Sequence, residues 1–370
     1  MWQLGAAVTA EEVLQAIEAI KRNKAADDEG LIAEALQQMS PDLWASLIAE
    51  SFNASFAEGK LSVAERFGIL KILYTKGDLR ILTNYRPLTI TSIIYKVKAT
   101  VIASRWKKIL PAVIAECQHG FVYGRRQFEN VMKIRDACAM ADMTADAKYY
   151  EQHPDSIPAG HQPDLLLGDL TKIEDDLAVY ICDRDKAFDR VCHLWLVRAL
   201  CRLCGCHCEW RPTLEEYLTS SPVVTPDGHA PLPDAVRWIV VLLHDHYRRA
   251  IINGQKTDAW RLLCSVFQGC PLAPQLYAVA CEFEGRLQIA DPRVVGIAPP
   301  RPCDLLTDWL ADIIAARFAD DTQNLTAVKS TNFMLNNNGM WCKGTGGGTQ
   351  VVKQELTLRL AYFKVVVALL

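Results

Sequence analysis

The run Asp183-Arg-Asp-Lys-Ala-Phe-Asp-Arg190 follows directly on a short apolar run, Leu177-Ala-Val-Tyr-Ile-Cys182. An apolar run of this length, bounded by polar residues, is typical of a buried strand. Asp183 then stands at the end of that strand, where an unpaired carboxylate is costly to bury. A carboxylate at such a position either binds a ligand or caps a turn, and the neighbours of Asp183 fit both roles equally.

A second apolar run, Ile313–Phe318, leads into Ala319-Asp320-Asp321. Most acidic dipeptides are solvated loop residues, but this one follows a predicted strand. Two strands that bring carboxylates to one edge of a sheet are suited to hold hard divalent cations. We therefore expect Asp183, Asp320 and Asp321 to meet at one metal site. Two such ions, about 3.5–4 Å apart, can serve an in-line displacement at phosphorus.

Further stretches lie upstream of and between these carboxylates. Lys76-Gly-Asp78 precedes Asn84-Tyr-Arg-Pro-Leu-Thr89, Gln118-His-Gly-Phe-Val-Tyr-Gly-Arg125 follows, and Phe267-Gln-Gly-Cys-Pro-Leu-Ala-Pro274 lies between the two acidic stretches. With those acidic stretches, they resemble in order the fingers and palm motifs of reverse transcriptases from non-LTR retrotransposons. One such motif is a weak signal, but five in the family's order are a strong one.

The resemblance covers roughly the first 325 residues and includes a fainter echo at Lys24–Gly30. The chain departs from the pattern at Ala273, where the family usually has serine. No thumb motif is clear from Thr326 to Leu370, so we expect a chain whose thumb is missing or incomplete, through truncation or degeneration.

The resemblance implies an α+β fold, the fingers and palm of a right-hand polymerase, with an antiparallel palm sheet packed on helices. We expect an N-terminal helical extension over 1–59 and fingers over 60–176, with an inserted loop near 144–176 that is rich in proline, glycine and acidic residues. The palm would cover 177–328, and a divergent tail would cover 329–370.

The same resemblance implies RNA-directed DNA polymerase activity on an RNA template and a DNA primer, with deoxynucleoside triphosphates as substrates. Asp183, Asp320 and Asp321 would be the catalytic acids and the ligands of two Mg²⁺ ions, with Mn²⁺ as a substitute. A catalytically weak relic that only binds nucleic acid is the alternative, because the thumb is not evident.

Five residues would contact the nucleotide: Lys76, Arg86, Phe188, Gln268 and Gly269. The ring of Phe188 would collide with a 2′-hydroxyl, although a core phenylalanine would fit the same pattern. Lys76 and Arg86 would face the triphosphate, because a guanidinium can bind phosphate oxygens with two hydrogen bonds. A solvated basic loop is the alternative, above all for Lys76. Gln268 and Gly269 would lie under the base pair, although a plain turn also uses glycine.

The net charge of −3 conceals one strongly basic block. Residues 60–135 carry fifteen Lys/Arg against four Asp/Glu, whereas residues 1–59 carry three against ten. The block fits a nucleic-acid surface and a solvated basic face equally well. Within it, the resemblance implies that Arg125 and Arg126 follow the template backbone.

Composition and apolar spacing limit the remaining possibilities. No transmembrane run or secretory signal is visible, so we expect a soluble intracellular protein whose thirteen cysteines are reduced. The cluster at 201–208 lacks a second ligand pair at zinc-finger spacing, which favours small buried thiols. The spacing predicts a strand over 68–74 and a hairpin turn at 251–254, and helices over 9–20, about 92–116, 191–204, 235–249 and 275–288.

Overall fold

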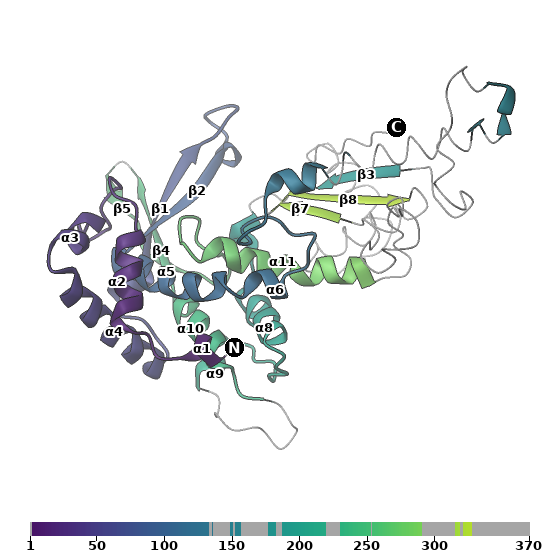
Figure 1. Cartoon of the computed structure of the whole chain (residues 1–370). Coiled ribbons are helices and arrows are strands. Elements are labelled where there is room, and N and C mark those ends of the chain that lie inside the picture. The colour runs from purple at the N-terminus through teal and green to yellow at the C-terminus, as the bar shows by residue number, and fades with distance from the viewer. Residues whose placement is uncertain are drawn as a thin grey trace. The chain divides into compact units, whose positions relative to one another are not determined.

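The computed structural model places helices and β-strands in two compact units (Figure 1). Unit 1 comprises residues 1–114 and 186–281, and unit 2 comprises 115–185 and 282–370. The structure describes residues 2–132, 135, 149–150, 152–156, 177–182, 187–219, 230–252, 254–290, 315–318 and 321–327. Because these residues form both helices and sheets with antiparallel strands, the chain is of the α+β class, as predicted. The inserted loop predicted near 144–176 lies largely outside the described residues, and the divergent tail predicted over 329–370 lies entirely outside them.

Four helices begin the chain: α1 (Trp2–Gly5), α2 (Ala10–Ala19), α3 (Ala33–Gln38) and α4 (Pro41–Glu58). The predicted helix over 9–20 is confirmed by α2, which Thr9 and Glu12 begin with a reciprocal capping box. The backbone of Gly59, at φ 78°, ends α4 in a left-handed conformation that favours glycine. Helix α2 packs between α4 and a later helix, α5 (Ile93–Lys107).

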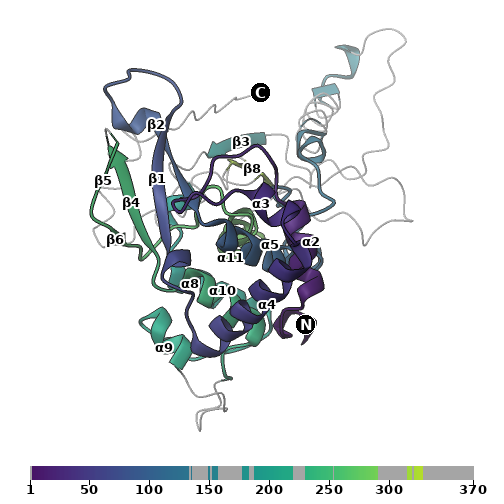
Figure 2. The same cartoon turned by 90° about the vertical axis from the view of Figure 1, so that its left-hand side faces the viewer.

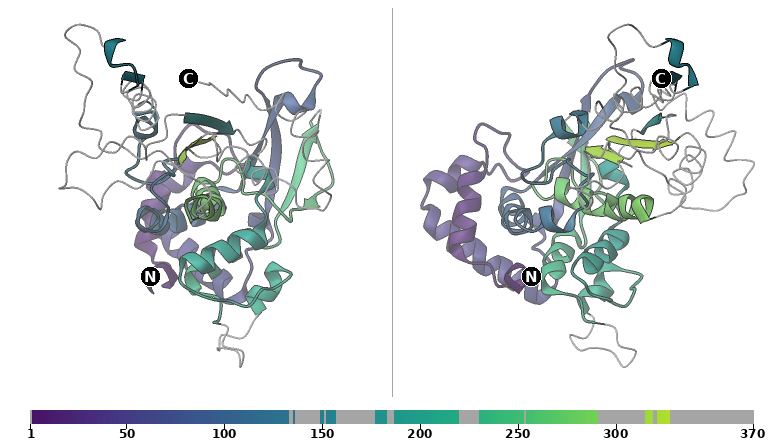
Figure 3. Two further views of the ribbon diagram at one scale, coloured as in Figure 1. Left: turned by 90° about the vertical axis from the view of Figure 1, so that its right-hand side faces the viewer. Right: turned by 45° about the vertical axis from the view of Figure 1, so that its right-hand side comes forward.

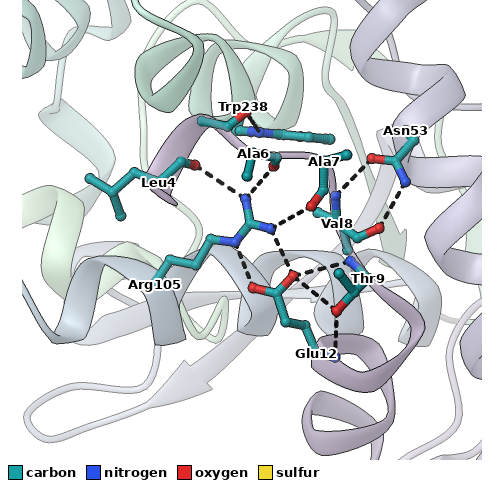
Figure 4. Close-up of polar contacts among 10 residues, drawn as sticks. Leu4, Ala6, Ala7, Val8, Thr9, Glu12, Asn53, Arg105 and Trp238 are labelled. Atoms are coloured by element: carbon teal, nitrogen blue, oxygen red, sulfur yellow. Dashed lines mark hydrogen bonds and ion pairs between the residues drawn. The ribbon is translucent and has the colours of Figure 1, made fainter. Parts of the chain in front are cut away.

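Arg105, near the end of α5, fixes the first residues of the chain (Figure 4). Its guanidinium binds both carboxylate oxygens of Glu12, each at 2.7 Å, and donates to the carbonyls of Leu4, Ala6 and Ala7. The Asn53 amide holds Val8 by its N–H and its carbonyl, each at 2.8 Å. Peptide groups that would otherwise lack partners are thereby satisfied by side chains of α4 and α5.

The centre of unit 1 is α10 (Asp234–Leu243), an apolar helix that packs against α1, α4, α5, α8 (His193–Leu203) and α9 (Leu214–Thr219) (Figure 2). Trp238 of α10 is almost fully buried, and its ring lies 4.6 Å from that of Phe52 and 4.2 Å from that of Phe56. A helix that is apolar on nearly every side belongs in a core.

The sheet of unit 1 has the strand order β2-β1-β4-β5, with β6 also paired to β4 (Figure 2). Its strands are β1 (Phe67–Tyr74), β2 (Tyr85–Thr91), β4 (Tyr247–Ile252), β5 (Gln255–Lys256) and β6 (Trp260–Arg261). Strands β1 and β2 form an antiparallel hairpin, and β4 joins β1 in parallel. The predicted strand over 68–74 and the predicted turn at 251–254 are both confirmed. Short 3-10 turns lie at Ala64–Arg66, Leu82–Asn84, Pro154–Ser156 and Ala187–Arg190.

Two predicted helices are too long. The helix expected over 92–116 ends at Lys107, and a separate short helix, α6 (Leu110–Val113), follows, because a proline at 111 in a continuous helix would clash with the carbonyl of residue 107. The helix expected over 235–249 ends at Leu243. Asp245 then takes a positive φ of 55° and pairs with Arg66 and Arg261, and the chain continues as β4.

The described part of unit 2 contains a three-stranded antiparallel sheet of order β3-β8-β7 (Figure 3). Its strands are β3 (Leu177–Cys182), β7 (Ala315–Phe318) and β8 (Asp321–Ala327). Helix α11 (Ala273–Ala290) contributes residues to both units. Among the described residues, no helix has both the length and the apolar character needed to cross a membrane.

Candidate active site

The hairpin of β1 and β2 carries the first two predicted nucleotide-binding residues. Arg86 is exposed on β2, opposite Leu73, and Lys76 is exposed in the connecting loop. Gly77 has a φ of 94°, and a Cβ there would lie 2.5 Å from the Asn84 amide, so the loop requires glycine. The structure therefore builds a tight, basic loop between these strands.

Gln268 and Gly269 lie in a turn docked on β2. The Thr89 N–H donates to the Gln268 carbonyl at 3.2 Å. Gly269 has a φ of 108°, and a Cβ at this position would lie 3.3 Å from the Thr89 carbonyl oxygen. Both the backbone conformation and the close approach of β2 therefore explain this glycine.

Phe188 lies beside the same turn. Its carbonyl accepts a hydrogen bond from the Val266 N–H at 2.9 Å, and the Val191 carbonyl accepts one from Ser265 at 2.8 Å. The half-buried ring of Phe188 stacks on the buried ring of Tyr277, with centroids 4.8 Å apart. Three stretches from distant parts of the sequence, 84–89, 187–191 and 265–269, are thus joined by backbone hydrogen bonds within unit 1.

Next to these joined stretches lies a buried polar cluster of Arg248, Asp189 and Ser265, which no sequence motif predicted. Arg248 of β4 donates to Asp189 Oδ1 at 3.1 Å and to Ser265 Oγ at 2.8 Å, and Ser265 Oγ also lies 3.2 Å from Asp189 Oδ1. The guanidinium stacks 5.0 Å from the centre of the Phe267 ring. Burial lowers the pKa of Arg248, and the Asp189 carboxylate opposes that shift. The one member of this cluster that the sequence could have indicated is Asp189, because it directly follows Phe188 in a motif.

The predicted catalytic carboxylates belong to unit 2, where the two strands that lead to them, β3 and β7, each pair with β8. Cys182, the last residue of β3, pairs with Thr322, the second residue of β8. Phe318, the last residue of β7, pairs with Asp321, the first of β8. Asp183 and Asp320 lie outside the described residues, as does the side chain of Asp321.

Arg125 and Arg126 differ in their surroundings. Arg125 is half-buried, and its guanidinium donates to the carbonyls of Ala115 at 2.5 Å and Gln118 at 2.8 Å. Arg126 is exposed. Arg125 therefore holds its own loop, and Arg126 is the better placed of the two for a partner in solution.

The basic block at 60–135 is less basic at the surface than its composition indicates. Lys98 is fully buried, 2.6 Å from Glu65, and the Arg105 side chain is only 9% exposed against Glu12. Arg66 pairs with Asp245. Lys98 is buried because α5 is covered on several sides, by α1, α2, α4 and α10.

The cysteine cluster at 201–208, which begins in the last turn of α8, contains the expected buried thiols in part. Cys201 and Cys204 are buried, and Cys206 and Cys208 are half-buried. Burial, with the neighbouring thiols, raises the pKa of Cys204 to about 11. Within the described ranges, no group of three or more His, Cys, Asp or Glu side chains is arranged to hold a metal ion.

The sequence is similar to one encoded by a transposon. It is 28% identical, over 279 residues, to an uncharacterized 149 kDa protein of transposon TX1 from Xenopus laevis. The aligned region covers 74% of this chain and 17% of that protein, so the chain spans about a sixth of its relative's length. No family profile matches the sequence. The chain is therefore similar to part of a transposon-encoded protein.

Proposed function

We propose that this chain is the fingers-and-palm core of a retrotransposon reverse transcriptase, an RNA-directed DNA polymerase that extends a DNA primer on an RNA template. The observation that carries the proposal is the joining of 84–89, 187–191 and 265–269 within unit 1. These stretches hold Arg86, Phe188, Gln268 and Gly269, which the motif resemblance assigns to one nucleotide pocket. The similarity to a transposon-encoded protein supports the same origin.

The register of the unit 2 sheet supports the catalytic part of the proposal. Asp183 follows Cys182 in the sequence, and Asp321 precedes Thr322, the partner of Cys182. Paired residues of antiparallel strands have Cα atoms about 4.5–5.5 Å apart, a spacing that suits carboxylates sharing a cation.

Asp183, Asp320 and Asp321 would thus offer the oxygen ligands that Mg²⁺ prefers, and Mn²⁺ accepts the same donors. When bound, such ions supply Lewis-acid stabilisation of charge at the reacting phosphate.

The test is primer extension by the full chain on an RNA template, with and without Mg²⁺. We expect extension that requires the ion, and we expect Asp183→Asn and Asp320→Asn each to reduce it by about a thousandfold or more. Glu116→Gln is a matched control, since Glu116 is an acidic residue outside the three motif carboxylates. Extension that is absent in the wild type, or unchanged in both Asp variants, would refute the proposal.

A further inference from the structure

The buried cluster of Arg248, Asp189 and Ser265 touches both sides of the proposed nucleotide pocket. Asp189 directly follows Phe188, and Ser265 lies three residues before Gln268. Arg248 binds both of them and stacks on Phe267, the residue just before Gln268. The Arg248 guanidinium therefore contacts residues adjacent to Phe188 and to Gln268. The distance between Phe188 and Gln268 would set the width of the pocket.

The cluster contains buried charge and backbone strain, both of which lower the stability of the fold. The Arg248 side chain is 8% exposed and that of Asp189 is 18% exposed, so two charges are withdrawn from water. Ser265 has a φ of 95°, a conformation that is strained for any residue other than glycine. His193 further binds the Ser265 carbonyl, at 2.7 Å from its Nε2 atom. Strain and buried charge held by several independent contacts are features of a site whose geometry is fixed for function.

We infer that Arg248 is a positioning residue that, through Asp189 and Ser265, fixes the distance between Phe188 and Gln268 and so sets the selectivity for deoxyribonucleotides over ribonucleotides. This inference rests on the proposed polymerase function. Arg248 acts through its neighbours and does not touch the sugar. Its planar fork suits the role, because two separate donors reach Asp189 and Ser265 at once, which a lysine ammonium does not reproduce.

The neighbouring arginine provides a matched control. Arg249 follows Arg248 in β4, so its side chain points to the opposite face of the strand. Its guanidinium lies over the ring of Phe67, 4.7 Å from the centre, away from Asp189 and Ser265. Arg249→Met therefore removes a stacked guanidinium from the same strand without changing the cluster.

The experiment is single-nucleotide primer extension with a deoxyribonucleoside or a ribonucleoside triphosphate, together with thermal unfolding of each variant. Ser265→Gly removes the hydroxyl and relieves the positive φ, so we expect a melting temperature that is unchanged or higher. We expect its preference for the deoxyribonucleotide to fall by about fivefold or more, because the two hydrogen bonds of the hydroxyl, with Arg248 and Asp189, are lost and each is worth about that factor. Arg248→Lys should lower the preference similarly and raise KM for the deoxyribonucleotide more than it lowers kcat. Arg249→Met should leave the preference at the wild-type value.

The outcomes separate this inference from the proposed function. An unchanged preference in Ser265→Gly and Arg248→Lys, in a wild type that extends primers, overturns the inference alone. So does a loss of preference in Ser265→Gly that accompanies a lower melting temperature, because that result reports simple loss of structure. A wild type that extends no primer overturns the proposed function, and the inference falls with it.

Discussion

At the scale of the residue, Lys98 is a charged side chain that lies in the core, against Glu65 and near the ring of Phe52, although it belongs to the basic block. Burial lowers the pKa of Lys98, and the adjacent Glu65 carboxylate opposes this. No local pattern distinguishes such a lysine from a solvated one, because its partner is contributed by another element. Arg248 was overlooked for the same reason.

Phe188 offers a direct test of the nucleotide pocket. If the chain polymerises, Phe188→Val should relax discrimination against ribonucleotides, because a smaller side chain leaves room for the 2′-hydroxyl. The change also removes the stacking on Tyr277, so we expect a stability loss of about 1–3 kcal/mol. Extension assays with both sugar types would measure the first effect. Unaltered sugar selectivity in an active variant would mean that Phe188 serves only the packing of unit 1.

His246 should make the protein sensitive to acid. Burial, with the nearby His193, lowers the pKa of His246 to about 3, while an unfolded histidine titrates near 6.5. The unfolded state therefore binds a proton that the folded state refuses, and stability is lost as the pH falls from about 6.5 towards 3. Thermal unfolding at several pH values should show this loss, and His246→Phe, placed between the rings of Tyr95 and Phe267, should reduce it. An equal pH dependence in the variant would contradict the assignment.

At the scale of the element, predictions succeeded where the signal was local. The helix over 9–20 and the turn before β5 both depend on a few adjacent residues. Errors arose where tertiary contacts decided the boundary. The apolar run after Asp234 continues smoothly in sequence, but pairing of Asp245 with Arg66 and Arg261 turns the chain into β4. The junction of the three motif stretches depends on hydrogen bonds between distant segments, which spacing alone does not predict.

The start of α5 provides an element-scale prediction. Asp27 is buried, and its carboxylate accepts from the backbone N–H of Ile93, the first residue of α5, at 3.0 Å. The same carboxylate accepts from Glu29 and Leu31, at 3.1 and 2.9 Å, and so orders its own turn. Asp27→Ala should therefore cost about 1–3 kcal/mol of stability, since it leaves donors unsatisfied.

The adjacent Asp28 is the control for this prediction. It is paired with Lys256, whose side chain is 46% exposed, and a pair so accessible to solvent contributes little. Asp28→Ala should cost less than about 1 kcal/mol. Denaturant unfolding of both variants gives the comparison, and equal losses would show that the carboxylate of Asp27 does not hold α5.

At the scale of the whole molecule, sequence motifs proved more informative than composition. Their order predicted an α+β chain, and the described sheets and helices confirm that class. The role of the carboxylates stays a prediction, because Asp183 and Asp320 lie outside the described residues. Composition, in contrast, predicted a basic surface of net charge +11 over 60–135, whereas part of that charge is neutralised in the core.

The difference between the total charge of residues 60–135 and the charge left at the surface predicts how strongly salt weakens the binding of nucleic acid. Cations that contact phosphates release counterions, so affinity should fall as the salt concentration rises, with a slope set by the number of contacts. The slope should be below the value expected from fifteen basic residues, because Lys98 and Arg105 are buried in ion pairs. Arg126 is exposed, so Arg126→Ala should reduce the slope by about one without changing the melting temperature.

Arg125→Ala should behave differently, because this guanidinium holds the carbonyls of Ala115 and Gln118. We expect a loss of stability of about 1–3 kcal/mol and a salt slope closer to that of the wild type. Titration of an RNA–DNA duplex at several salt concentrations, with thermal unfolding of each variant, separates the two arginines. A salt slope that falls in Arg125→Ala but stays at the wild-type value in Arg126→Ala would reverse the assignment, and the exposed arginine would then not be the one that meets phosphate.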